Sequence, residues 1–241
     1  MRLGRALAAA GAAAWVSYGW GAQCALPLLA VRRGVPGRRR VALTFDDGPD
    51  PEATPRLLEV LGARAVRATF FLIGERAARH PEVARATVAA GHEIGNHTWH
   101  HKNAWFLGPA ATAAEIVGGA RLVGEITGEV PRLYRPPWGI VNVAALSTVR
   151  RAGFTTVLWS MQSEGLRPRS PAHQLRYCAQ RLHDGAILDL HDAPGLPGAP
   201  QRLLALMPDL LDLLADRGLT AVPVGSLLAA RKTLEPPLAV G

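Results

Sequence analysis

The strongest fold signal lies in residues 41–73, which read VALTFDDGPDPEATPRLLEVLGARAVRATFFLI. This stretch begins with one apolar segment, Val41–Phe45, and ends with another, Ala68–Ile73. Between them, Pro55–Val66 carries apolar residues at three- and four-residue spacing, which is typical of a helix with one packed face. A strand, a helix and a second strand in this order predict a parallel β–α–β unit with a right-handed crossover.

The same alternation continues toward the C-terminus. We expect further strands at Glu93–Gly95, Arg132–Arg135, Thr155–Trp159, Ala186–Leu190 and Thr220–Pro223. We expect further helices at Glu75–Ala90, Ala110–Thr127, Asn142–Ala152, Pro171–Leu182 and Gln201–Arg217. About seven such units predict an α/β fold, a distorted (β/α) barrel of about seven strands. Because reactive groups in such barrels sit where strands end, each polar cluster can be judged by whether it follows a strand.

The net charge does not point to a nucleic-acid-binding protein. The chain has 241 residues, with 27 Lys+Arg, 19 Asp+Glu and a net charge of +8. Residues 1–40 contain seven of these basic residues and no acid, which leaves 20 bases for 19 acids in the rest. A nucleic-acid-binding domain needs a basic face on its folded part. The two cysteines, Cys24 and Cys178, are too few for a disulfide framework or a cysteine-based zinc site.

The N-terminal segment has the composition of a membrane anchor. Residues 6–31 are 26 consecutive residues without a charge, enough to cross a bilayer core of about 30 Å. Trp15, Tyr18 and Trp20 lie among alanines without a polar face, which favours a transmembrane helix over a buried amphipathic one. We therefore expect a single-pass N-terminal transmembrane helix.

This gives four parts: an anchor (1–31), a basic linker (32–40), a main domain (41–228) and a C-terminal tail (229–241). Two arginines precede the apolar segment and five follow it closely. By the positive-inside rule, that distribution would place the main domain in the cytoplasm.

Two adjacent carboxylates, Asp46 and Asp47, follow the first predicted strand and precede a Gly-Pro turn. Neighbouring side chains on a strand point in different directions, so one carboxylate could bind a metal while the other takes a proton. The alternative is an ordinary turn rich in Asp, Gly and Pro.

Three histidines, His97, His100 and His101, follow the third predicted strand. His97 and His101 are four residues apart, so on a helical turn they would share one face and could hold one metal ion. With Asp47 they would form a His-His-Asp set, which suits zinc, with cobalt or nickel as alternatives. A surface histidine cluster is the other interpretation.

The sequence Arg135-Pro136-Pro137-Trp138-Gly139 ends the fourth predicted strand. A guanidinium that points inward could orient a catalytic carboxylate. Prolines have no backbone N–H, so the N–H of Trp138 is the first one available to stabilise an oxyanion. The alternative is a proline-rich loop with an arginine in a structural ion pair.

A further cluster, LDLHD, ends the sixth predicted strand. Alternation places Asp189 and His191 on one face and Leu188 and Leu190 on the other. His191 is well placed for acid–base chemistry. We expect the other histidines to be structural: His92 packed, and His80, His173 and His183 on the surface.

Taken together, the motifs resemble those of the NodB-type polysaccharide deacetylases, carbohydrate esterase family 4. The resemblance covers about residues 41–228 and rests on motifs that occur in the family's order: TFDDGPDP, ATFFLIGERAARHPE, GHEIGNHTWHH, RPPWG and LDLHD. It implies a NodB homology domain that uses a divalent metal, usually zinc, to remove N-acetyl or O-acetyl groups from a carbohydrate. The family usually acts outside the cytoplasmic membrane, so the resemblance favours an extracytoplasmic domain despite the arginine count.

The resemblance also implies roles for individual residues. Asp47, His97 and His101 would bind the metal, Asp46 would be the general base, and His191 the general acid for the leaving amine. Arg135 would orient Asp46, and the Trp138 amide would stabilise the oxyanion. Leu190 could help to form a pocket for the acetyl methyl group.

The sequence departs from the family pattern after the fifth predicted strand. The family often carries an Asp-Trp pair there, whose Asp partners the acid histidine, whereas Gly165-Leu166 stands in its place here. Asp189 and Glu164 are the two candidates to supply the missing charge and raise the pKa of His191.

We therefore expect a membrane-bound deacetylase that acts on a polysaccharide containing N-acetylglucosamine, such as peptidoglycan or chitin. The alternatives are a deacetylase or deformylase of a lipid-linked sugar, and a carbohydrate-binding homologue without catalysis. No nucleic-acid partner is expected, and the sequence does not indicate an oligomeric state.

Overall fold

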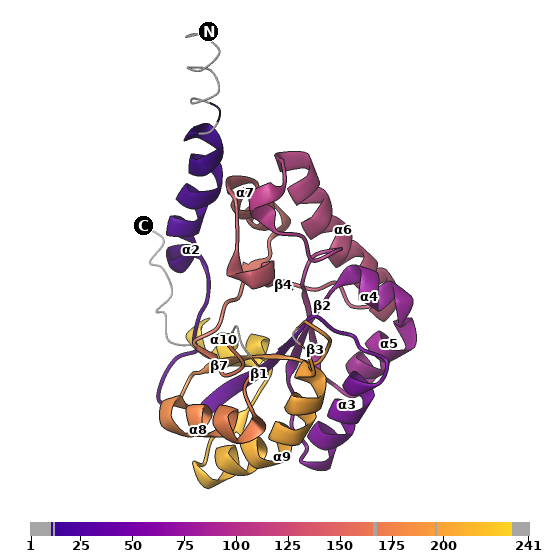
Figure 1. Ribbon diagram of the computed structural model, residues 1–241, viewed down its shortest axis with the longest axis vertical. Coiled ribbons are helices and arrows are strands. Elements are labelled where there is room, and N and C mark those ends of the chain that lie inside the picture. Colours follow the sequence, from indigo (N-terminus) through magenta and orange to yellow (C-terminus); the bar gives the residue numbers. More distant parts are fainter. Residues whose placement is uncertain (1–10, 12, 166–167, 196, 233–241) are drawn as a thin grey trace, which may run out of the picture.

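The computed structural model describes residues 11, 13–165, 168–195 and 197–232 (Figure 1). Its centre is a parallel sheet with the strand order β5–β4–β3–β2–β1–β7–β6. These strands span Arg40–Asp46 (β1), Thr69–Leu72 (β2), Glu93–Asn96 (β3), Leu133–Tyr134 (β4), Thr155–Thr156 (β5), Met161–Gln162 (β6) and Ile187–His191 (β7). An eighth strand, β8 (Thr220–Ala221), pairs with the start of β1. The sheet curls into a half-barrel of seven strands, so the predicted fold class is confirmed apart from the N-terminal helix.

Strand β1 lies at the centre because nearly all of its side chains can be buried. From Val41 to Asp46 every residue is buried, as expected for a strand covered on both faces. Its register places Asp46 opposite Phe71 of β2 and His191 of β7, which brings the end of β1 beside the end of β7.

Helices pack around the outside of the curled sheet (Figure 1). They are α3 (Ala53–Ala63), α4 (Gly74–Arg79), α5 (Pro81–Ala89), α6 (Pro109–Thr127), α7 (Val143–Ala152), α8 (Pro171–Arg181) and α9 (Ala199–Asp216). The main core fills the space between sheet and helices, with Leu43 and Phe45 of β1 packed among leucines of α3 and α9.

The secondary structure differs from the prediction at three places. The single helix expected at Glu75–Ala90 is two helices, because the chain leaves the helical conformation at His80, just before Pro81. Strand β6 was not predicted, since two residues carry no periodic signal. Helix α10 (Val224–Lys232) was also missed, and its Val224 and Leu227 lie in an apolar cluster with Phe71 and Ile187 of the sheet.

The N-terminal segment forms a short π-helix, η1 (Ser17–Gly21), followed by α2 (Ala22–Leu29), which stands beside α7 (Figure 1). Among the described residues, no helix combines the length and the apolar character needed to cross a membrane. The predicted transmembrane helix is therefore not supported. Residues 1–10 and 12, where the predicted anchor begins, lie outside the described residues.

One side of this helix is packed against the barrel. Ala22 and Leu26 are 2% and 1% exposed and lie in a cluster with Tyr134, Val141 and Ala145. The same N-terminal segment also exposes large apolar residues: Trp15, Val16, Trp20, Leu28 and Leu29.

The end of the predicted anchor and the start of the predicted linker take part in the barrel. Val31 forms a parallel bridge to Val157, just after β5, and Arg33 forms an antiparallel bridge to Ala186, just before β7. The backbone N–H of Val31 donates to Thr156, and that of Gly34 donates to Gly185. The linker therefore joins the β5 edge of the sheet to the start of β7.

Candidate active site

The polar clusters after the predicted strands meet at the carboxyl ends of the strands. Asp46 ends β1 and His191 ends β7, while His97 follows β3 and Arg135 follows β4. Because all these strands are parallel, their ends lie at the same edge of the curled sheet.

Asp47, His97 and His101 form a three-donor cluster. Asp47 Oδ1 lies 3.4 Å from His97 Nε2 and 3.1 Å from His101 Nε2. These atoms lie within 4.8 Å of one another, the arrangement that a shared metal ion requires. His97 Nδ1 is 2.8 Å from the carbonyl oxygen of Arg135, and since a carbonyl only accepts, Nδ1 carries the hydrogen and Nε2 is left free as a ligand.

The donor set fits a divalent metal. Asp47 Oδ1 is buried and makes no hydrogen bond, although two imidazole nitrogens face it. An unpaired buried carboxylate oxygen is costly unless a ligand satisfies it. Burial alone would raise the pKa of Asp47, but the neighbouring His97 and His101 lower it well below its usual value. Burial lowers the pKa of His101 to about 4, so its imidazole is neutral and able to bind a metal near neutral pH.

The histidine loop is irregular, and the predicted helical turn at His97–His101 is wrong. Thr98 and His101 have positive φ angles of 68° and 56°, and this backbone brings the two imidazole rings to a centroid distance of 4.9 Å. Two consecutive glycines of α6 allow the loop to pack closely on that helix. A Cβ at Gly119 would lie 2.5 Å from the backbone of Thr98, and one at Gly118 would lie 2.5 Å from the Trp99 ring.

Asp46 is held by a fully buried arginine. Arg135 Nη1 donates to Asp46 Oδ1 at 2.7 Å, to Thr44 Oγ1 at 2.8 Å and to Asp189 Oδ1 at 3.2 Å. The guanidinium lies 4.2 Å from the centre of the Phe71 ring, which leaves it little room to move. Arg135 thus orients Asp46 with its charge compensated, as a buried ion pair requires.

Of the two candidate partners for His191, Glu164 makes the contact. Glu164 Oε2 lies 2.5 Å from His191 Nδ1, whereas Asp189 bonds to Arg135 and to the side chain of Gln162. Burial alone would lower the pKa of His191, but the negative charges of Asp189 and Glu164 raise it well above its usual value. Burial and the charge of Asp46 raise the pKa of Asp189 to about 7. Leu166 lies outside the described residues.

Trp138 lies at the tip of the loop that follows β4. Both Trp138 and Gly139 have positive φ angles, 53° and 67°. The Trp138 ring is 57% exposed, and its edge lies over His101 with the centroids 4.3 Å apart. The ring of Trp138 therefore lies beside His101, a member of the three-donor cluster.

A cavity of about 580 Å³ opens over these groups. Its lining includes Asp47, His101, Trp138, Glu164 and His191. Leu190, predicted to face the substrate, is 1% exposed and lies in the core between the sheet and α9. It points away from the site because strand alternation gives the inner face to Asp189 and His191, so the prediction for Leu190 is corrected.

Several residues that support the site were missed in the sequence. Arg76 donates to the carbonyl oxygens of Asp47 and Pro194, and Glu115 accepts from the backbone and lies 2.7 Å from the ring of His100. Asp192 Oδ2 accepts from Thr54 Oγ1. Arg76 and Asp192 stand inside motifs that were recognised, so their places in those motifs were the available signal. Glu115 lies on a predicted helix and gave none.

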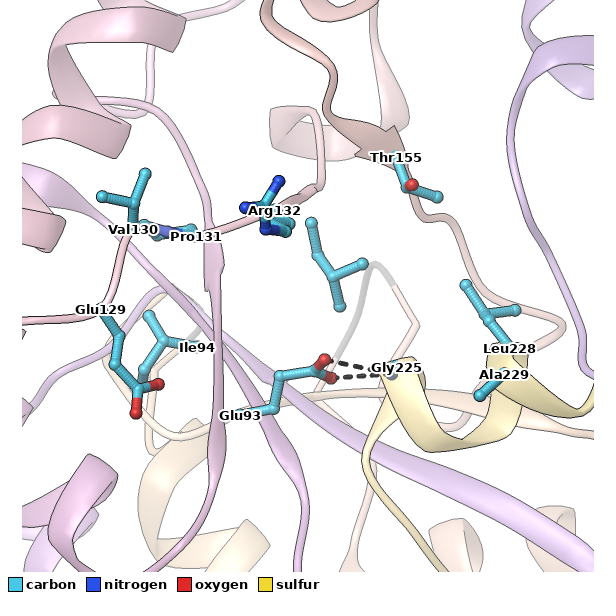
Figure 2. Close-up of a pocket in the computed structure, with 11 residues that line it drawn as sticks. Glu93, Ile94, Glu129, Val130, Pro131, Arg132, Thr155, Gly225, Leu228 and Ala229 are labelled. Atoms are coloured by element: carbon cyan, nitrogen blue, oxygen red, sulfur yellow. Dashed lines mark hydrogen bonds between the residues drawn. The ribbon is translucent and has the colours of Figure 1, made fainter. Parts of the chain in front are cut away.

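A second cavity, of about 610 Å³, lies at the opposite end of the barrel, where the strands begin (Figure 2). Glu93 at the start of β3 points into it and accepts hydrogen bonds from the Gly225 N–H at the start of α10, as Figure 2 shows, and from Thr69. Among the described residues, no metal-binding group of His, Cys, Asp or Glu includes a residue lining this cavity.

The chain is similar to known deacetylases. The family model described as "Polysaccharide deacetylase" matches residues 33–157. A chitooligosaccharide deacetylase of Bradyrhizobium sp. (strain ANU 289) is 38% identical over 181 residues, which are 73% of this chain and 82% of that protein. A peptidoglycan-N-acetylglucosamine deacetylase of Bacillus cereus is 34% identical over 197 residues, 80% of this chain and 91% of that protein. In structure, a family 4 carbohydrate esterase from Streptomyces lividans in complex with acetate matches with a TM-score of 0.69 and 34% identity, covering 76% of this chain and 91% of that one.

Proposed function

The chain belongs to the polysaccharide deacetylase family, and on that premise we propose that it hydrolyses N-acetyl groups of an N-acetylglucosamine-containing glycan with the help of a divalent metal. One observation carries the proposal. Asp46, which a buried arginine holds, lies 3.8 Å from His97 of the three-donor cluster, and its carboxylate lies within 4.8 Å of a ring nitrogen of His191, which a second carboxylate holds. Members of the cluster and His191 line one cavity. This is the arrangement that a base, an acid and an electrophile need around one acyl group.

Asp46 acts as the general base in this proposal. It takes a proton from the water that attacks the acetyl carbonyl carbon, while Arg135 fixes its direction. The backbone N–H of Trp138 donates to the carbonyl oxygen as negative charge develops there.

His191 acts as the general acid. Glu164 holds Nδ1, so Nε2 is the nitrogen that gives its proton to the amide nitrogen as the carbon–nitrogen bond breaks. An amine is a poor leaving group unless it is protonated, so a raised His191 pKa serves the reaction at neutral pH. The products are acetate and the free amino sugar.

Asp47, His97 and His101 would hold the divalent metal. A cation bound there supplies Lewis-acid charge next to the acetyl carbonyl. Two imidazoles and one carboxylate suit zinc, and cobalt or nickel are compatible with the same donors.

The test is acetate release by the full chain from chitooligosaccharides, peptidoglycan and an O-acetylated xylan. The proposal expects release from at least one N-acetylated substrate and its loss in Asp46→Asn. If the metal-loaded chain releases acetate only from the xylan, the activity is that of an O-esterase. If it releases none but binds the glycans, the chain is a carbohydrate-binding homologue without catalysis.

We also propose that the chain acts outside the cytoplasmic membrane and is held at the membrane by its N-terminal helix. The support is the exposed apolar residues of the N-terminal segment, with Trp20 62% exposed and Leu29 61% exposed, followed by Arg32 and Arg33, which can meet anionic lipid head groups. Protease added to intact cells should cut the catalytic domain, and protection until lysis would place the domain in the cytoplasm.

A further inference from the structure

The N-terminal helix is bonded directly to the loop that carries Trp138. Gln23 of α2 reaches this loop with both ends of its side-chain amide. Its Nε2 donates to the carbonyl oxygen of Gly139 at 2.9 Å, and its Oε1 accepts from the backbone N–H of Val141 at 3.1 Å. One side chain therefore bridges two backbone groups that lie within three residues after Trp138.

A second hydrogen bond holds the same loop. The indole Nε1 of Trp105 donates to the carbonyl oxygen of Val141 at 3.1 Å. The π-helix η1 supports Trp105, because a Cβ at Gly19 would lie 3.2 Å from the indole ring. Val141 is thus held through its N–H by Gln23 and through its carbonyl by Trp105.

The loop needs such support because its backbone is unusual. Trp138 and Gly139 both have positive φ angles, and a side chain as large as that of Trp adopts this conformation rarely. A strained conformation of this kind persists only when the surrounding structure over-determines it. The bonds of Gln23 and Trp105 lie within three residues of Trp138 and provide that constraint.

We propose that Gln23 is a positioning residue for catalysis: it holds the Trp138 loop so that the Trp138 N–H faces the developing oxyanion. The N-terminal helix then contributes to turnover as well as to attachment. This inference rests on the proposed deacetylation. It gives the segment that precedes the catalytic domain a role in the chemistry.

The test compares Gln23→Leu, which removes both hydrogen bonds at similar volume, with Gln23→Glu, which keeps the acceptor for Val141 but loses the donor to Gly139. Leu28→Ala is the matched control on the same helix, since Leu28 is 88% exposed. Each full-length variant is assayed on a chitooligosaccharide and on 4-nitrophenyl acetate, whose leaving group needs no protonation.

Losing a whole oxyanion donor costs about 10²–10³-fold in kcat, so a displaced donor in Gln23→Leu should cost about tenfold. We expect this loss of kcat on both substrates, with KM and the pH profile nearly unchanged, because the donor acts mainly in the transition state. Gln23→Glu should fall between Gln23→Leu and the parent, and Leu28→Ala should match the parent. A merely structural role of Gln23 would lower thermal stability and leave kcat of the folded fraction unchanged, which would overturn the proposal.

Hydrogen–deuterium exchange tests the hydrogen bonds of Gln23 to Gly139 and Val141, here called the clamp, by a measurement that does not depend on enzyme activity. In Gln23→Leu the amide of Val141 should exchange faster, whereas in Leu28→Ala it should exchange as in the parent. Unchanged exchange in Gln23→Leu would overturn the proposed clamp. If the parent releases no acetate but exchange at Val141 still rises in Gln23→Leu, the proposed deacetylation is wrong. The clamp is then a structural contact only, and its proposed role in catalysis is overturned as well.

Discussion

Carboxylates have different hydrogen-bond environments at the two ends of the barrel: Glu93 at one end is half-buried, whereas Asp46 and Asp47 at the other are buried. At the end where the strands begin, Glu93 has its oxygens bonded to the Thr69 hydroxyl and to the Gly225 N–H at the first turn of α10. At the end where the strands finish, Asp47 Oδ1 is buried without a hydrogen bond, and Asp46 shares one arginine nitrogen with Asp189.

This difference suggests that Glu93 serves the stability of the fold, whereas Asp46 and Asp47 serve the chemistry of the site. A carboxylate with complete hydrogen bonds at a helix N-terminus stabilises the fold. Buried carboxylates that lack hydrogen-bond partners, or that lie close to another carboxylate, lower the stability of the fold. They are retained where a bound ligand or a proton compensates their charge. The following predictions test this division, from the largest expected effect on activity to the smallest.

Metal removal should have the largest effect. A chelator should reduce acetate release to the background rate, and added zinc should restore it, because the donors around Asp47 then regain their shared cation. Elemental analysis of Asp47→Ala and His101→Ala should show the metal lost, while Glu93→Gln at the other end keeps it. Full activity in the chelated, metal-free chain would contradict the division.

Asp46→Asn should come next. Loss of the general base is expected to lower kcat by about 10²–10⁴-fold. Asparagine can still accept from Arg135, so metal content and thermal unfolding should stay close to those of the parent. The measurement is steady-state kinetics alongside a melting curve.

Gly48→Ala should have an intermediate effect. A Cβ at Gly48 would lie 2.6 Å from Asp192 Oδ1, so the turn after Asp47 or the Asp192 side chain must shift. Because a displacement of about 1 Å can cost about 10²-fold, we expect kcat to fall by up to that factor. Gly62→Ala in α3 is the control, since a Cβ there meets nothing within 4 Å. Equal kinetics in both variants would show that the turn tolerates the change.

Glu164→Gln should change the pH profile more than the maximal rate. The charge of Glu164 contributes to raising the pKa of His191, and the protonated acid is lost as pH rises through that pKa. Without that charge the pKa falls, so the alkaline limb of the profile for chitooligosaccharide should move to lower pH. The rate on 4-nitrophenyl acetate should change less, because its leaving group needs no proton. An unmoved alkaline limb would mean that another group is the acid.

Glu93→Gln should have the smallest effect on activity and a measurable effect on stability. The loss of a charge-assisted bond at the start of α10 should cost about 1 kcal/mol of unfolding free energy. The values of kcat and KM should stay unchanged, which denaturant unfolding and kinetics together can check. A large loss of activity would instead show that the two ends are coupled.

Much of the candidate site could be predicted because its residues follow strands that are recognisable in the local sequence. Asp46 and Asp47 follow a buried strand, and His97 and His101 follow another, so parallel strands alone bring them to one edge. The choice between Asp189 and Glu164 could not be made, because it depends on how β6 and the chain after it lie against β7, and two-residue strands leave no periodic pattern.

The structure of the N-terminal segment could not be predicted from its local sequence. Its lack of charge predicted a membrane span, yet the same composition also suits a helix packed against a barrel, as Ala22 and Leu26 show. Small apolar residues permit both environments, and the contacts of Gln23 with Gly139 and Val141 join segments too far apart in the chain for any local pattern. The prediction that Leu190 lines the substrate pocket was wrong for a simpler reason. In an alternating strand Leu190 lies on the face opposite to Asp189 and His191, so it points away from the site.

The pairing of Val31 with Val157 and of Arg33 with Ala186 has a consequence for the order of folding. Strand β1 pairs with β2, and β2 with β3, close in the chain, so these three strands can pair while synthesis continues. Residues 31–34 must wait for β5 and β7, which emerge from the ribosome long after them. Residues 31–34 can therefore join the sheet only after most of the catalytic domain has been synthesised.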